Sequence, residues 1–309
     1  MPYLHSLRLL QAKKIKLTRT THPYENVLHF FYTRRSGSLI RNIINRRWFN
    51  SLIGNYYDSS LSTRAIPSFI EKYGLSLTEA ARPNVKDYTT FNDFFTRKLK
   101  PEARPIDSNP HTIVSPADGA ILVIPSLKTS SPFPIKGKTF HLKTFLNNTW
   151  LAKNYEGGTA LIFRIGPSEY HRYHFPLDNT PTASQRIQGR YDSVNPIAFT
   201  HIQPLHTNER RLIKLEQSAC GTVLMISVGA LCVGKIIDTY TLGIPYKKGD
   251  EAGYFCFGGS TVVLIFPPDT LQVNPVLVKN SSKGIETRIK MGQSIGTIIS
   301  TAKITARDQ

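Results

Sequence analysis

The residues most capable of chemistry lie in three short segments of the chain. Residues 115–119 read SPADG, residues 170–176 read YHRYHFP and residues 257–261 read FGGST. In chain order they supply an aspartate, two histidines, and a serine that directly follows a glycine. Each of these side-chain types can act as an acid, a base or a nucleophile.

The aspartate and the histidines also allow a purely structural interpretation. Asp118 lies in a Pro-Ala-Asp-Gly sequence, which is typical of a turn before a strand. His171 and His174 are three residues apart, but no third ligand is evident, so the sequence predicts no metal site. A single general base is favoured over a metal site because a neutral imidazole titrates near working pH. A histidine with only a packing role remains the alternative.

The third segment offers an unhindered peptide bond immediately before a hydroxyl group. Gly259 has no Cβ, so the Oγ atom of Ser260 could reach the Gly259 carbonyl and attack it. The segment is not a GxSxG nucleophile elbow, and no lysine follows the glycines as it would in a P-loop. The alternative is a simple glycine turn before a strand.

The elements that must position these segments change in character near residue 100. Before it, the spacing of apolar residues predicts helices over 39–53, 61–75 and 91–99, and Pro101 marks the end of that half. After it, short β-rich runs are separated by Gly, Pro, Asp and Asn. The predicted strands include residues 120–124, 160–165, 222–228, 231–237, 261–266 and 276–278. This order predicts an α+β fold.

We expect two regions, a basic helical region over residues 1–90 and a β-rich catalytic core over residues 91–309. With 309 residues, of which 40% are hydrophobic, the chain can bury a core, which excludes a disordered or fibrous protein. Its three cysteines, Cys220, Cys232 and Cys256, are too widely spaced for a disulfide scaffold or a four-cysteine zinc site. No apolar stretch is convincing as a membrane span.

Positive charge is concentrated at the N-terminus. The net charge is +18, and the first 50 residues contain ten basic side chains and one acidic one. Over residues 39–53, apolar side chains that include Trp48 recur at helical spacing beside Arg41, Arg46 and Arg47. This pattern predicts either a helix that lies in an anionic membrane surface or one that packs on the core. Nucleic acid is disfavoured as a partner, because no RNP-like aromatic set or zinc-finger spacing is present.

In their order along the chain, the three segments resemble those of phosphatidylserine decarboxylase proenzymes. The resemblance spans roughly residues 90–300 and includes residues 91–106 (FNDFFTRKLKPEARPI), 208–210 (NER), 228–234 (VGALCVG) and 247–261 (KKGDEAGYFCFGGST). The cleavage motif of this family often reads LGST. The GGST of this chain resembles a variant of one bacterial branch and keeps the glycine before the serine.

The resemblance implies a self-cleaving triad. Asp118 would orient His174, which would remove the proton from Ser260 so that it attacks the Gly259 carbonyl. The chain would then be cut into residues 1–259 (the β chain) and residues 260–309 (the α chain), which stay together as a heterodimer. Ser260 would become a covalent pyruvoyl cofactor, and His171 is implied only as a residue that shapes the pocket.

The resemblance also implies an activity and a location. The pyruvoyl group would form a Schiff base with phosphatidylserine and accept electrons as CO₂ leaves, which gives phosphatidylethanolamine. The protein would be a lyase of phospholipid biosynthesis, made as a zymogen and held peripherally on the cytoplasmic side of the cell membrane. Two alternatives remain: a triad serine hydrolase that acts on external esters and keeps an intact chain, and a non-catalytic peripheral membrane protein.

Overall fold

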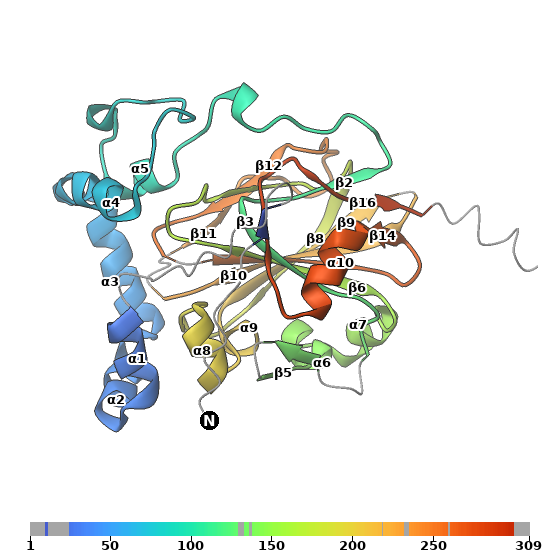
Figure 1. Cartoon of the computed structure of the whole chain (residues 1–309), viewed down its shortest axis with the longest axis horizontal. Helices are drawn as coiled ribbons and strands as arrows, with labels where there is room; N and C mark the ends of the chain where they lie inside the picture. The colour runs from blue at the N-terminus through green and yellow to red at the C-terminus, as the bar shows by residue number, and fades with distance from the viewer. Residues whose placement is uncertain are drawn as a thin grey trace, which may run out of the picture.

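An eight-stranded sheet forms the centre of the molecule (Figure 1). The computed structural model describes residues 10–11, 25–128, 133–135, 138–217, 219–231, 235–258 and 260–299. The strand order is β1-β15-β3-β6-β13-β10-β9-β8, and neighbours are antiparallel except β1 and β15. The strands are β1 (Leu10–Gln11), β15 (Thr287–Ile289), β3 (Gly119–Ile124), β6 (Thr159–Ile165), β13 (Ser260–Phe266), β10 (Gly221–Gly229), β9 (Arg210–Gln217) and β8 (Thr180–Ile187).

Three small sheets and several short helices surround this sheet. The small sheets have the orders β11-β12-β7, β14-β16-β2 and β4-β5. Their strands are β11 (Ile236–Asp238), β12 (Glu251–Phe255), β7 (Arg172–His174), β14 (Leu271–Val273), β16 (Ser294–Ile298), β2 (Thr112–Val114), β4 (Phe133–Ile135) and β5 (Lys138–Phe140). The helices are α6 (Leu142–Leu146), α7 (Thr149–Asn154), α8 (Pro196–His201), α9 (Pro204–Thr207) and α10 (Pro275–Ser282).

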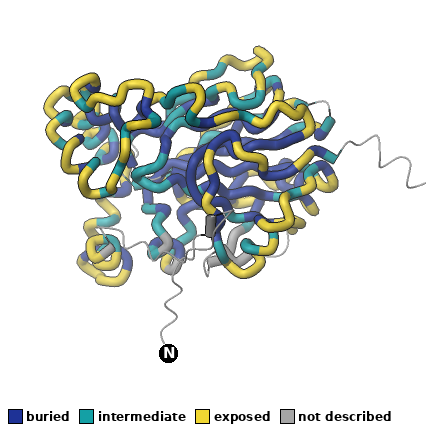
Figure 2. The backbone as a smooth tube through the Cα atoms, turned by 45° about the horizontal axis from the view of Figure 1, so that its top comes forward, coloured by how far each residue is buried: buried dark blue, intermediate teal, exposed yellow. Residues whose placement is uncertain are grey.

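The middle of the large sheet is covered on both faces. Every residue of β13 is buried, in agreement with its sequence STVVLIF, a continuous run typical of a strand without a solvent face (Figure 2). Its neighbours β6 and β10 contribute buried apolar residues to the same core, such as Leu161, Phe163, Leu224 and Ile226. Residues at the ends of these strands are therefore held in place by the core.

The N-terminal region forms a helical arm beside the sheet (Figure 1). The arm consists of α1 (Glu25–Thr33), α2 (Arg35–Ile44), α3 (Arg47–Tyr57), η1 (Ser60–Arg64) and α4 (Ala65–Tyr73). The short elements η2 (Val85–Asp87), α5 (Phe91–Phe95) and η3 (Pro101–Ala103) lead to the sheet. The predicted α+β class is confirmed, whereas the boundary at residue 90 stays a prediction. No helix within the described ranges is long and apolar enough to cross a bilayer.

An aromatic cluster connects the arm to the third chemical segment. Phe69 of α4 and Phe91 and Phe95 of α5 pack around Phe257, the first residue of FGGST. The backbone N–H of Phe257 donates a 2.8 Å hydrogen bond to the side-chain oxygen of Asn92. The arm and α5 thereby fix the backbone just before Ser260.

The predicted helix over 39–53 is wrong in one respect, because two helices occupy this range and the break falls at Asn45 and Arg46. The carbonyl of Asn45 accepts a 3.0 Å hydrogen bond from the N–H of Tyr191 in the core. The Asn50 side chain donates to the carbonyls of Ile44 and Arg46, both at 2.8 Å. These bonds satisfy the carbonyls that the break exposes, so the turn costs little.

Other element predictions need correction. Residues 276–278 lie in α10 and not in a strand, because Asn274 caps the helix through the N–H of Val276 and Pro275 occupies its first position. The helix over 91–99 ends at Phe95, and the strand over 231–237 begins only at Ile236, with residues 232–234 and thus Cys232 outside the described residues. The strand β1 also lies within the half predicted to be helical.

Candidate active site

Ser260 is the first residue of the central strand β13. It is opposite Ile165 of β6 and Gly229 of β10, and it is fully buried. Its Oγ atom has no hydrogen-bond partner, which is unusual for a buried hydroxyl and typical of a group kept for chemistry. Gly258 has a φ of 139°, a conformation that favours glycine. Gly259, the predicted cleavage partner, lies outside the described residues.

Asp118 lies at the same end of the sheet as Ser260. Gly119 begins β3, two strands from β13, and a Cβ on it would be 2.3 Å from the carbonyl oxygen of Arg164. The backbones of β3 and β6 therefore lie close together here. Because β6 separates β3 from β13, Asp118 is two strand spacings, roughly 10 Å, from the Ser260 backbone. Its carboxylate accepts hydrogen bonds from Arg104 Nε at 2.9 Å and from the N–H of Met291 at 2.8 Å. Asp118 is therefore a buried anion paired with the Arg104 cation.

His174 lies beside the SPADG loop, because its backbone N–H donates a 2.8 Å hydrogen bond to the carbonyl of Pro116. The ring Nδ1 atom is 2.9 Å from the carbonyl oxygen of Gly249, and Nε2 is 3.2 Å from the Tyr170 hydroxyl. A carbonyl can only accept, so Nδ1 carries the proton and Nε2 accepts from Tyr170. Burial lowers the pKa of His174, so its Nε2 is an available base at neutral pH.

His171 lies against the segment that precedes Ser260. Its ring packs on Phe95 with a centroid distance of 3.8 Å, and Nδ1 donates to the carbonyl of Glu169 at 2.9 Å. The buried Nε2 atom has no hydrogen-bond partner. Burial and then the charge of Arg97 lower the pKa of His171 to about 3, against a weaker opposing effect of the Glu169 and Gly258 backbones. His171 is thus a neutral imidazole with a free lone pair close to Gly258.

The predicted residues that the structure describes lie at one end of the sheet, but no hydrogen bond connects their side chains. Among the described residues, the side chains of Asp118, His174 and Ser260 make no hydrogen bond to one another, because Arg104 holds the first and Gly249 and Tyr170 hold the second. His171 Nε2 and Ser260 Oγ have no hydrogen-bond partner within the described ranges. No cluster of three or more possible metal ligands occurs in the part of the chain that the structure describes.

Sequence reasoning did not identify three residues of this site: Arg97, Arg104 and Tyr170. Arg97 is 6% exposed, and its Nη1 atom has no hydrogen-bond partner. Arg104 also pairs at 2.8 Å with Glu79, whose side chain is largely exposed, so the network around Asp118 extends to the surface. All three lie within or next to segments already quoted for the family resemblance, but only the folded structure reveals their burial and pairing.

A buried serine without a hydrogen-bond partner, near a paired aspartate and two neutral histidines, defines a site for nucleophilic serine chemistry on an α+β scaffold. The family model for phosphatidylserine decarboxylase matches residues 91–297. The chain therefore belongs to the phosphatidylserine decarboxylase family, as the three motifs predicted.

Similar proteins cover most of the chain. The phosphatidylserine decarboxylase proenzyme of Clostridium perfringens is 39% identical over 260 residues, which make up 84% of this chain and 88% of that protein. The proenzyme of Fusobacterium nucleatum is 39% identical over 88% of this chain and 91% of its own length. That of Chlamydia muridarum is 40% identical over 86% and 89%, respectively. The similarity thus includes part of the helical arm as well as the core.

Proposed function

We propose that this chain is made as a proenzyme, cuts itself between Gly259 and Ser260, and then decarboxylates phosphatidylserine to phosphatidylethanolamine. The observation that carries the proposal is the buried Ser260 Oγ atom, which has no partner and directly follows the glycine pair. Family membership and the word proenzyme in the names of the relatives support it.

Self-cleavage needs only groups of this chain and water. Ser260 Oγ adds to the Gly259 carbonyl carbon as its proton passes to a base; the C–N bond breaks, and the nitrogen takes up a proton to leave an ester. Loss of the Ser260 Cα proton then expels the carboxylate of residues 1–259. Water converts the resulting dehydroalanine into ammonia and a pyruvoyl group at residue 260. The two chains stay together because β13 pairs with β6 over its whole length and with β10 as far as Ile265.

We assign the base to His174 and its electrostatic support to Asp118. The Nε2 atom of His174 carries no proton, and Asp118 favours the charged imidazole that forms when it takes one. In the uncut chain Nε2 accepts from Tyr170, so cleavage requires it to exchange Tyr170 for Ser260. A His174→Asn variant should stay uncut while His171→Asn is cut; the opposite result would transfer the role of base to His171.

The site fits a pyruvoyl group at residue 260, because that position is buried and follows Gly258, whose backbone acts on His171; His171 Nε2 and Arg97 Nη1 are buried and have no hydrogen-bond partner. The group supplies an electron-withdrawing carbonyl conjugated to the headgroup that loses CO₂. Arg97 offers a buried positive charge for an anionic group of the substrate, and His174 offers a proton for the product carbon.

We also propose that the helical arm attaches the protein to an anionic membrane as a peripheral protein on the cytoplasmic side. Leu39, Ile43, Trp48 and Leu52 of α2 and α3 are all more than half exposed to solvent. These apolar side chains lie beside exposed arginines, a combination typical of an interfacial helix. Arg41 is not available for binding to the membrane, because it pairs with Asp192 at 3.8 Å and packs over the Tyr32 ring.

An assay of CO₂ release from the serine headgroup tests the proposed activity. The purified protein should release CO₂ from phosphatidylserine labelled at the serine carboxyl group and yield phosphatidylethanolamine, whereas Ser260→Ala should release none. Hydrolysis of simple esters by an uncut parent protein, without CO₂ release, would instead support the serine hydrolase.

A further inference from the structure

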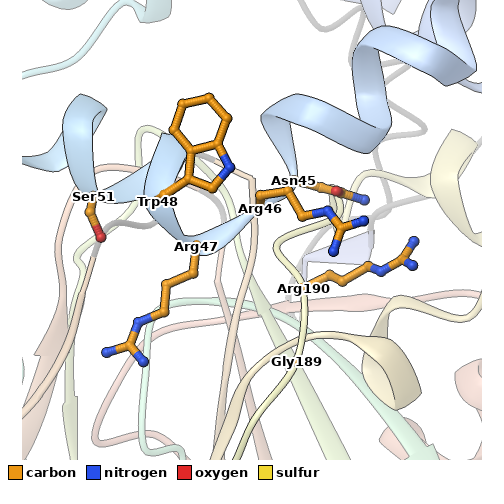
Figure 3. Close-up of a pocket in the computed structure, with 7 residues that line it drawn as sticks. All are labelled: Asn45, Arg46, Arg47, Trp48, Ser51, Gly189 and Arg190. Atoms are coloured by element: carbon orange, nitrogen blue, oxygen red, sulfur yellow. The ribbon is translucent and has the colours of Figure 1, made fainter.

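A pocket lies outside the candidate active site, where the turn between α2 and α3 faces the loop after β8 (Figure 3). Its volume is about 540 Å³. The arm lines it with Arg46, Arg47, Trp48 and Ser51, and the core lines it with Arg190. We call it the arginine pocket. Neither the cleavage chemistry nor the family motifs explain why three arginines meet there.

The arginine pocket is positively charged and has no acidic lining residue. The nearby acids are already paired: Asp192 with Arg41 and the Asn45 side chain, and Glu209 with Arg186 and the Tyr191 hydroxyl, the last two at 2.8 Å. Within the described part of the chain, none of the three pocket arginines forms an ion pair. In Figure 3 the guanidinium groups of Arg46 and Arg190 point to the same side of the pocket.

The start of α3 adds to this positive potential. The helix has 11 residues, its N-cap Arg46 makes no side-chain capping bond, and its first turn contains no acidic residue. The free N–H groups of such a turn and the helix dipole favour a bound anion. Together with the guanidinium groups of Arg46 and Arg190, they provide donors that suit the oxygens of a phosphate group.

Contacts between the arm and the core keep the pocket in shape without a ligand. Asn45 binds Asp192 through its side chain and Tyr191 through its carbonyl, so the α2–α3 turn is fastened to the core. On the other wall, a Cβ on Gly189 would lie 2.4 Å from the carbonyl carbon of Asn208, so only glycine permits the close backbone approach that places Arg190. The two walls are thus held at a fixed separation.

The surroundings of the pocket indicate the kind of anion. Trp48 at its rim is 57% exposed, and Ile43 and Leu52 on the same two helices are 52% and 60% exposed. A cationic pocket beside an apolar surface complements a molecule with a phosphate group and acyl chains, whereas a nucleic acid or free phosphate would leave the apolar side chains uncovered.

We propose that the arginine pocket binds the phosphodiester group of an anionic glycerophospholipid, separate from the lipid that is decarboxylated. This deepens the membrane attachment proposed above and does not depend on the decarboxylation chemistry. Occupation of the pocket would orient the arm on the membrane through one specific lipid in addition to diffuse attraction.

Trp48 provides a direct readout. The chain has two tryptophans, and replacing the exposed Trp150 with Phe leaves Trp48 as the only one. In this Trp150→Phe protein, the probe is dihexanoyl phosphatidylglycerol below its micelle concentration, which is not a decarboxylation substrate. We expect a saturable change in Trp48 emission that fits one site.

Paired variants distinguish the pocket from general positive charge. Arg46→Gln with Arg190→Gln should weaken binding on the order of thirtyfold, since each basic side chain beside an anionic lipid contributes about fivefold. Arg34→Gln with Arg35→Gln removes the same charge from the other end of α2 and should change the affinity by less than about twofold. Circular dichroism of both pairs should match the parent, which confirms that they fold.

Three results would overturn the proposal: no saturable change with the lipid probe, an equal loss of affinity in both variant pairs, or equally tight binding of inorganic phosphate in the same titration. None of them would affect the proposed decarboxylation, because the probe cannot be decarboxylated. Conversely, binding in the pocket by a protein that fails to release CO₂ from phosphatidylserine would leave this proposal intact.

Discussion

At the scale of single residues, the site keeps two imidazoles neutral and pairs one buried carboxylate with an arginine. The carboxylate of Asp118 accepts hydrogen bonds from Arg104 on one side and from the N–H of Met291 on another. The imidazoles are neutral because burial disfavours their charged form. Such opposite environments for acid and base are typical of catalytic sites.

Replacing Asp118 by Asn should slow self-cleavage on the order of 10⁴-fold, by analogy with hydrolases in which the loss of this charge leaves the imidazole in the wrong state. The rate is measured by electrophoresis of newly made protein over time. Glu79→Gln is the matched control, because it breaks the other ion pair of Arg104 and leaves Asp118 in place. If Asp118→Asn is cut at the parent rate, Asp118 has no part in the mechanism.

Protonation of His171 should be coupled to unfolding. Its pKa is about 3 in the folded chain, against an ordinary value of 6.5. Between these pH values the unfolded chain binds a proton that the folded chain excludes, so the free energy of unfolding decreases as pH falls, by up to about 1.4 kcal/mol per pH unit.

Urea denaturation in the uncut Ser260→Ala background measures this slope. The additional replacement His171→Gln should reduce the slope between pH 6.5 and about pH 3, because glutamine takes up no proton there. Identical slopes with and without His171 would show that the imidazole is not held neutral by the fold.

At the scale of elements, the cleavage segment is a tight connection between β12 and β13 that the arm holds from outside. Phe257 is fastened to Asn92 and the aromatic cluster, and Ser260 is fastened to the sheet. The proposed scissile bond is thus flanked by anchored residues on both sides. A short segment held at both ends can keep the hydroxyl close to its target carbonyl.

Gly258→Ala should therefore slow cleavage, because the φ of 139° at this position is strained for any residue with a Cβ. A strain of about 1–3 kcal/mol that raises the activation free energy of cleavage corresponds to a rate lower by roughly fivefold to 150-fold. Gly166→Ala is the control, because its Cβ would meet only Glu169 Cγ at 3.5 Å, an ordinary contact. Equal cleavage rates in the two variants would mean that the conformation at Gly258 is irrelevant.

The sequence predicted the central strands well because β3, β6, β10 and β13 are continuous apolar runs whose pattern depends on local burial alone. Prediction from the sequence failed where contacts between residues far apart in the chain determine the local structure. The break between α2 and α3 depends on Tyr191 and Asp192, and the pairing of Arg104 with Asp118 requires the whole fold. The three motifs led to the family, but not to the hydrogen bonds that engage His174 in the uncut chain.

At the scale of the whole molecule, the arm gives a strongly basic protein one apolar exposed face. The basic residues before residue 20 lie outside the described residues, whereas Arg46, Arg47 and Arg190 line the arginine pocket. The proposed chemistry lies in the sheet, whereas most of the exposed large apolar side chains among the described residues lie on the arm. Attachment to a lipid surface and catalysis can therefore be altered separately.

Vesicle binding should accordingly have two components. Attraction of the basic side chains to anionic lipid is screened over about 8 Å at physiological salt, whereas burial of apolar side chains is not. High salt should thus weaken sedimentation with phosphatidylglycerol vesicles but leave a residual part. Leu39→Ser with Leu52→Ser should abolish this salt-resistant binding, since burying a leucine contributes roughly 1.5–3 kcal/mol.

The control for this experiment is Leu242→Ser, which changes an exposed leucine outside the arm. It should bind vesicles like the parent at every salt concentration. If the two arm replacements also bind like the parent in high salt, the membrane-facing surface lies elsewhere on the molecule.

The intact mass of the purified protein under denaturing conditions tests the central claim most directly. We expect two chains, residues 1–259 and residues 260–309, with the shorter chain bearing a pyruvoyl group in place of an N-terminal serine. Ser260→Ala, which lacks the hydroxyl, should give one chain of full length. A parent protein that releases CO₂ from phosphatidylserine while its mass is that of the uncut 309-residue chain would contradict the account.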